Sequence, residues 1–221
     1  MMGLNVTGAC LMLTMLMMAG SPLSAQVWKA TLEGPQATGS DLAAKQVARP
    51  ASSFVPTGFS VPVLVETEKF KIVPLGPNLA KVDFDAYMSS VEHLQKTFTR
   101  STNWPHQNIS DADAMQDMKT EQARFENRES FAYAVLTPDG RRERGCVYVY
   151  PSTVEGYSAV VTMWVTKDEY DAGFDAELYK WVGNWMQKDW PFARVAYPGR
   201  AIAWGAWDSM VASSKAKKAA L

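Results

Sequence analysis

The segment from residue 131 to residue 150 constrains the fold more than any other part of this sequence. FAYAVL (131–136) alternates so that Phe131, Tyr133 and Val135 share one face, which is the period of a β-strand. TPDG (137–140) follows, with a proline that presets a turn and a glycine that accepts positive φ. GCVYVY (145–150) then supplies a second strand. The segment therefore predicts a β-hairpin at the centre of the domain.

The hairpin is followed by a third strand and a helix. SAVVTMWV (158–165) is almost continuously apolar, as in a central strand that is covered on both faces. After an acidic loop, the apolar residues from Leu178 to Met186 recur at helical spacing. FKIVPL (70–75) and FARVAY (192–197) predict a first and a last strand.

Two further helices are expected between the first strand and the hairpin. The apolar residues of segment 83–98 lie three and four residues apart, on one face of a helix. Ser110 and Asp113 have the spacing of a capping box and start another helix. The order predicts an α/β (α+β) fold with a mixed, mostly antiparallel sheet and helices on both faces. Only residues 198–221 follow the fifth strand, so we expect the fold to be truncated there.

The N-terminus predicts export. The first 25 residues carry no charge, and the apolar run 9–20 is too short to span a bilayer of about 30 Å. We expect a signal peptide at 1–25, a linker at 26–57, a domain at 58–210 and a flexible basic tail at 211–221. The protein would then be periplasmic or secreted. Because no Lys or Arg precedes the apolar run, an apolar appendage on a cytoplasmic protein is the alternative.

Charge and cysteine content exclude several classes of function. A net charge of −1 predicts no affinity for nucleic acid, nor for membranes beyond the signal segment. Cleavage after residue 25 would remove Cys10 and leave Cys146, which we interpret as a buried strand residue rather than a reactive thiol. His93 and His106 have no neighbouring ligand at metal spacing, so we expect no metal. The oligomeric state stays open.

Three segments, taken in order, resemble the GNAT superfamily of acyl-CoA-dependent N-acetyltransferases. VETEKFKIVPLGP (65–77) is similar to the family's first strand. FAYAVLTPDGRRERGCVYVYPS (131–152) is similar to its second and third strands. WPFARVAYPGR (190–200) is similar to the fifth strand of a small, divergent bacterial group. The resemblance spans about residues 59–200.

The resemblance implies where a donor would bind. In this family the fourth and fifth strands splay apart, and the pantetheine of acetyl-CoA lies between them against backbone. By resemblance, Val165, Thr166 and Lys167 would face the pantetheine. Tyr170 and Gly173 take the first two marked places of the phosphate loop, which is Arg or Gln, two residues, Gly, one residue, then Gly or Ala.

The phosphate loop also departs from the family pattern. Asp175 stands where the family has Gly or Ala, and a carboxylate beside a pyrophosphate costs on the order of several kcal/mol at an effective dielectric of about 20. We expect Asp175 to act as the N-cap of the following helix. Trp104, in the loop between the first two helices, would either cover the acceptor or pack as a structural tryptophan.

Two functions remain open. The first is an N-acyltransferase that moves an acetyl group from acetyl-CoA to a small-molecule or peptide amine. The second is a non-catalytic, exported binding or structural domain that has lost acyl-CoA binding. The sequence identifies no catalytic residue: the fourth strand carries neither acid nor histidine. Trp204 and Trp207 are expected to cover an open sheet edge.

Overall fold

The computed structural model describes residues 54–220, which lie within the compact unit Gln36–Leu221. The predicted signal peptide (1–25), Cys10 and the predicted linker up to residue 53 lie outside the described residues. The last part of that linker is packed, because Val55 is fully buried. No helix in the range 54–220 has the length and apolar character needed to cross a membrane.

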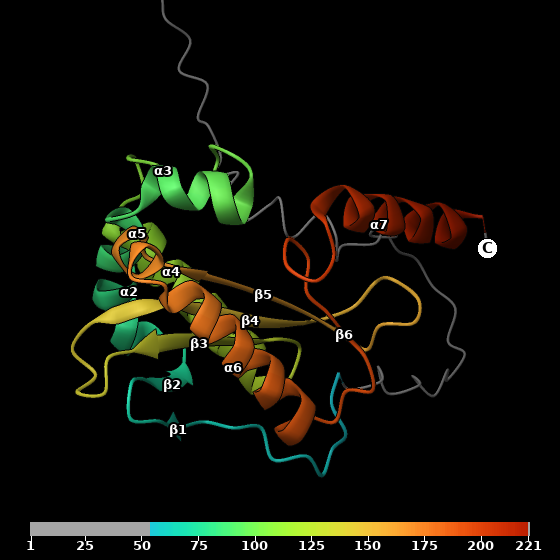
Figure 1. Ribbon diagram of the computed structural model, residues 1–221, viewed down its shortest axis with the longest axis horizontal. Helices are drawn as coiled ribbons and strands as arrows, with labels where there is room; N and C mark the ends of the chain where they lie inside the picture. The colour runs from blue at the N-terminus through green and yellow to red at the C-terminus, as the bar shows by residue number, and fades with distance from the viewer. Residues whose placement is uncertain (1–53, 221) are drawn as a thin grey trace, which may run out of the picture. The chain divides into compact units, whose positions relative to one another are not determined.

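A six-stranded sheet forms the centre of the fold (Figure 1). Its strands follow the order of the chain, and every neighbouring pair is antiparallel except the last, β5 and β6, which is parallel. The strands are β1 (Val65–Glu66), β2 (Lys71–Pro74), β3 (Phe131–Leu136), β4 (Glu143–Pro151), β5 (Ala159–Val165) and β6 (Val195–Ala196). The predicted hairpin is therefore confirmed as β3 and β4.

Helices cover both faces of the sheet, as predicted. On one face, α6 packs against alternate residues of the strands, and on the other face α2 and α4 pack against the intervening residues (Figure 1). The helices and helical turns are η1 (Pro77–Leu79), α2 (Ala80–Met88), α3 (Val91–Leu94), η2 (Gln95–Thr99), α4 (Asp111–Glu126), α5 (Lys167–Asp171), α6 (Phe174–Asp189) and α7 (Trp204–Ala219).

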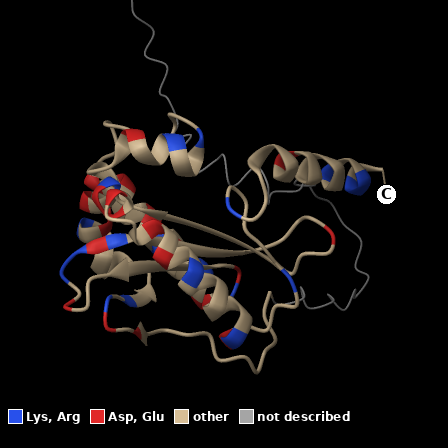
Figure 2. Ribbon diagram, viewed as in Figure 1, with Lys and Arg blue, Asp and Glu red and all other residues tan. Residues whose placement is uncertain are grey.

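The central strands are buried on both sides. Every residue of β3 and of β5 is buried, which explains their continuously apolar sequences. Figure 2 shows Lys, Arg, Asp and Glu mainly on the helices and loops. Glu143, the first residue of β4, is an exception, since only 1% of it is exposed.

The helix predicted at 83–98 is divided in two. The structure has α2, α3 and the π-helical turn η2 in this segment. The Ser89 hydroxyl donates to the carbonyl oxygen of Ala86 at 2.7 Å, and Ser90 leaves the helical conformation at φ −137°. A serine that bonds the backbone of its own helix favours an end at that point. The capping box that begins α4 is confirmed, with Ser110 and Asp113 bonding each other's backbone.

The C-terminal segment continues as a helix. Strand β6 is shorter than predicted, and after it the chain turns into α7, which crosses the expected boundary at residue 210. Residues 211–219 of the expected tail belong to this helix. Trp207 is its buried residue and packs near Ala196 of β6, at the edge of the sheet.

Candidate functional site

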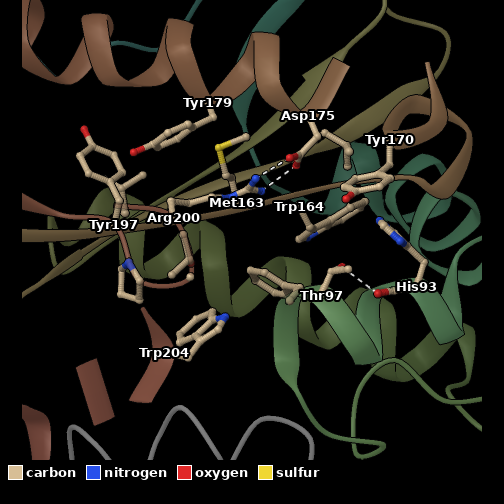
Figure 3. Close-up of a pocket in the computed structure, with 16 residues that line it drawn as sticks. His93, Thr97, Met163, Trp164, Tyr170, Asp175, Tyr179, Tyr197, Arg200 and Trp204 are labelled. Carbon is tan, nitrogen blue, oxygen red and sulfur yellow. Dashed lines mark hydrogen bonds and ion pairs between the residues drawn. The ribbon is translucent and has the colours of Figure 1, made fainter. Parts of the chain in front are cut away.

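The sheet opens between β5 and β6. The two strands pair only through Ala159 and Val160 of β5, whereas β5 pairs with β4 along its whole length. A cavity of about 230 Å³ lies where the strands part. Residues Val161–Val165 line one side and Tyr197–Arg200 line the other (Figure 3). The cavity thus exposes a strand edge that has no strand partner among the described residues.

Asp175 and Arg200 form a two-pronged ion pair inside this cavity (Figure 3). Nη2 of Arg200 donates to Oδ1 of Asp175 at 2.6 Å, and Nη1 donates to the other carboxylate oxygen. The hydrogen bond to Asp175 raises the pKa of Arg200. Because Asp175 belongs to α6 and Arg200 follows β6, the pair bridges two elements that border the gap.

The expected role of Asp175 as a helix cap is wrong. The N-cap of α6 is Gly173, at φ +82°, and Asp175 is the second residue of the helix. Glycine adopts this left-handed conformation readily, which lets the chain end α5 and start α6 within two residues. The Asp175 side chain is thereby free to reach Arg200.

His93 lies at the other end of the cavity. Its ring centroid is 4.9 Å from that of Tyr170 (Figure 3). Burial lowers the pKa of His93 below its ordinary value of 6.5, and the charge of Lys167 acts in the same direction. Nearby carboxylates and a hydrogen bond with the backbone of Val165 oppose the shift. His93 is therefore neutral at neutral pH and can accept a proton.

Two tyrosines stand near the ion pair. Tyr197 directly follows β6 and meets Tyr179 of α6 edge to face, with ring centroids 5.6 Å apart (Figure 3). Burial, together with Tyr179, raises the pKa of Tyr197 to about 12. Its hydroxyl is therefore protonated at neutral pH and can donate a hydrogen bond or a proton.

Comparison with solved structures identifies the fold that contains this cavity. A structure described as a probable acetyltransferase matches 61% of this chain and 72% of its own, with a TM-score of 0.50 and 15% identity. The chain has a GNAT-like fold. The separation of its last two strands is the feature that the resemblance implied, and the structure shows that they pair in parallel. No family model matches the sequence, and no curated protein matches it.

Two other solved structures show the range of the likeness. The ribosomal-protein-S5-alanine acetyltransferase from Vibrio fischeri is 14% identical, with a TM-score of 0.46 over 57% of this chain and 68% of its own. A possible acetyltransferase from Clostridium difficile 630 is 8% identical, with a TM-score of 0.41 over 68% of this chain and 90% of its own.

In this GNAT-like fold the segment after β5 is a short helix rather than an open loop. Val165 ends β5 and lines the cavity. The Thr166 hydroxyl caps α5 by accepting from the amide of Glu169. The amide of Lys167 donates to Oγ of Ser90 at 2.8 Å.

The phosphate-loop positions are also engaged within the chain. The amide of Gly173 donates to the carbonyl oxygen of Tyr170 at 3.0 Å. Tyr170 itself is 47% exposed and lines the cavity. The structure therefore brings Val165 and Tyr170 to the gap, while the amides of Lys167 and Gly173 already have partners. That these residues contact a donor stays a prediction.

Trp104 packs behind the cavity and does not line it, and that it covers an acceptor stays a prediction. Its ring packs against Tyr87, Phe98 and Trp164, with centroids 5.2, 6.1 and 6.4 Å away. It is not among the residues that line the pocket, although Phe98 and Trp164 are. Trp104 thus supports the lining from behind.

Trp204 closes one side of the cavity (Figure 3) and also packs, with Trp207, against Val160 and Ala196 at the edge of the sheet. The guanidinium of Arg100 lies 4.2 Å from the centroid of its ring and also bonds both carboxylate oxygens of Asp208, at 2.9 and 3.1 Å. These contacts tie the start of α7 to the turn after η2. Sequence reasoning missed Trp204, His93, Tyr197 and the ion pair, because each acquires its place through distant parts of the chain.

Proposed function

We propose that this chain is a GNAT-like N-acyltransferase that transfers an acetyl group from acetyl-CoA to an amine. The observation that carries the proposal is the gap in the sheet, where the parallel pairing of β5 and β6 stops after two residue pairs. A cavity lies at this point and is bordered by polar and aromatic side chains. The acceptor is proposed to be a small-molecule or peptide amine.

The donor is proposed to lie along β5. Between Val161 and Val165 the strand is paired only with β4, so the backbone groups on its other edge can bond the amides of a pantetheine arm. Arg200 offers a guanidinium to the donor's phosphates, and α6 begins nearby without a side-chain cap. Amides at an uncapped helix N-terminus favour an anion. The carboxylate of Asp175 opposes phosphate binding less than the sequence predicts, because Arg200 balances its charge.

The proposed chemistry uses two side chains. His93 takes a proton from the acceptor ammonium, and the free amine attacks the thioester carbonyl carbon. The nitrogen of the tetrahedral intermediate loses its second proton to solvent, the carbon–sulfur bond breaks, and the leaving thiolate takes a proton from the Tyr197 hydroxyl. Tyr197 regains its proton from solvent as His93 releases one, so the products are an amide and CoA thiol. Backbone N–H groups on the open edge of β5 are proposed to stabilise the oxyanion.

We expect the rate of acetyl transfer to fall at acidic pH as His93 is protonated. The pKa of His93 lies below its ordinary value of 6.5, so kcat/KM should be level at neutral pH and drop only when the pH is lowered below 6.5. His93→Gln should lower kcat/KM about 100-fold or more and flatten this acidic limb. The measurement is a pH profile of acetyl transfer to a panel of amines.

His106→Gln is the matched control for this profile, because His106 is the other histidine of the chain. It lies in the loop before α4, where its Nδ1 accepts from the amide of Asn108, and it does not line the cavity. We expect an unchanged profile. An acidic limb that persists in His93→Gln would contradict the assignment of His93 as the base.

A non-catalytic binding domain is the second candidate. The Asp175–Arg200 pair lies across the gap, and the amides of Lys167 and Gly173 are already bonded, which favours a scaffold that no longer takes a donor. Calorimetry with acetyl-CoA separates the two candidates. Binding in the micromolar range would support the acyltransferase, and no binding at millimolar concentration would leave the binding domain.

The compartment bears on the same choice, since acyl-CoA is a cytosolic metabolite. We propose that residues 1–25 are removed on export and that the mature chain starts near Gln26. The intact mass of the native protein from fractionated cells tests this. A full-length chain in the cytosol would exclude cleavage and favour the acyltransferase.

A further inference from the structure

Three ionisable side chains lie close together on the face of the sheet that α2 and α4 cover, away from the cavity between β5 and β6. Asp83 comes from α2, while Glu143 and Cys146 come from β4. The Cys146 thiol lies 2.9 Å from Oε1 of Glu143 and 3.5 Å from Oδ1 of Asp83. One ligand atom from each residue lies within 4.8 Å of the other two. None of the three lines the cavity.

The cluster is buried, although carboxyl and thiol groups that can carry a charge are costly to remove from water. Asp83, Glu143 and Cys146 are 4%, 1% and 0% exposed and are surrounded by the apolar side chains packed beneath α2 and α4. Oε2 of Glu143 is buried without a hydrogen-bond partner. A buried carboxylate oxygen without a partner is costly, so this atom is the second, independent sign of a missing ligand.

The electrostatic surroundings favour a cation. The neighbouring charges that act on Asp83 come from Asp117 and Glu121, which are both acidic. Burial raises the pKa of all three groups in the cluster. The cluster must therefore either hold protons or bind a positive ion in their place.

The donor set selects the kind of ion. Ca²⁺ and Mg²⁺ prefer oxygen ligands alone, whereas a thiolate with carboxylate oxygens suits Zn²⁺. Zinc takes four ligands in tetrahedral sites. The Cys146 sulfur and one oxygen each from Asp83 and Glu143 would provide three donor atoms, and a water molecule would take the fourth position.

We propose that Asp83, Glu143 and Cys146 bind one Zn²⁺ ion, which fastens α2 to the start of β4. Binding displaces the protons of the thiol and the carboxyl groups, so the affinity falls as the pH is lowered. The ion enters during folding, because the three residues are closed off from solvent in the folded chain.

Refolding in the presence of metal tests the proposal. The full chain is unfolded in guanidinium with a chelator, then refolded with Co²⁺ or Zn²⁺ and passed through a desalting column. We expect about one ion per chain by elemental analysis and a thiolate-to-Co²⁺ charge-transfer band. Zn²⁺ should also raise the Tm relative to refolding with chelator.

Two variants test whether the retained metal is bound by Cys146 and its neighbours. Cys146→Ser should lose the charge-transfer band and retain metal at least about tenfold more weakly. Asp139→Asn changes an exposed carboxylate in the turn between β3 and β4 and should leave both readouts unchanged. Metal retained equally by wild type and Cys146→Ser would overturn the proposal.

The wild type alone also decides the question if Cys146→Ser does not fold. Equal Tm values with Zn²⁺ and with chelator, and no ion retained, would show that the cluster is held by shared protons only. Retention of one ion with a charge-transfer band would support the zinc site. This outcome is independent of acetyl-CoA binding and of any transferase activity.

Discussion

Gly145→Ala is expected to cost about 3 kcal/mol or more of the free energy of unfolding. A Cβ at this position would lie 2.0 Å from the carbonyl oxygen of Trp164 and 2.8 Å from Cα of Val165. Both atoms belong to the backbone of β5, so no side-chain rotation relieves the contact. The strands β4 and β5 must move apart at the point where β5 borders the cavity. Urea unfolding followed by circular dichroism measures the loss.

Gly183→Ala is the matched control, with the same chemical change and the opposite expected sign. Gly183 lies inside α6, and a Cβ there meets no atom within 4 Å. Because glycine is a poor helix former, alanine should stabilise the chain by about 0.5–1 kcal/mol. Equal effects of the two substitutions would mean that β4 does not approach β5 as closely as described.

Arg200→Ala is expected to weaken acetyl-CoA binding about 100-fold or more, if the donor occupies the gap. The substitution removes a guanidinium that can face the donor's phosphates and leaves the buried Asp175 carboxylate without its partner. Truncating one member of a buried, hydrogen-bonded charge pair costs roughly 2–5 kcal/mol. Asp175→Asn should act in the other direction and tighten binding about tenfold, because it removes a like charge and releases Arg200.

A double variant and a control at an exposed residue show whether the change in acetyl-CoA affinity comes from the Asp175–Arg200 pair. Asp175→Asn with Arg200→Ala should recover part of the binding lost in Arg200→Ala, since no unpaired carboxylate remains. Asp171→Asn removes an exposed charge of α5 that pairs with Lys167, and binding should stay within about twofold. Calorimetry on folded variants gives all four values. If every variant, Asp175→Asn included, fails to bind at millimolar acetyl-CoA, the proposed donor is wrong.

The features that sequence predicted well are local ones. The strand predicted at residues 131–136 is β3 with the same bounds, and the capping box at Ser110 is present, because both depend on neighbouring residues. The order of elements and the resemblance also led to the GNAT-like fold. The separation of β5 from β6 followed from that resemblance rather than from periodicity, and their parallel pairing is shown by the structure.

The features that the sequence did not predict depend on contacts between residues far apart in the chain, or lie in a segment whose composition suits both a helix and a polar tail. The position of Asp175 at the start of a helix predicts a cap, whereas its actual partner, Arg200, comes from beyond the next strand. Cys146 was correctly predicted as a buried strand residue, but Asp83 is 63 positions away from it. The basic, polar composition of segment 211–219 predicts a tail, yet alanine and lysine are good helix formers and extend α7.

Few buried side chains attach helix α7 to the rest of the domain, and this affects how a ligand in the cavity binds. Trp207 is its buried residue, while Trp204 at its first position closes the cavity. Local unfolding of such a segment needs less free energy than global unfolding. A ligand that packs against Trp204 must slow amide hydrogen exchange throughout α7, and by reciprocity any contact that secures α7, such as Arg100 with Asp208, increases the equilibrium affinity for that ligand.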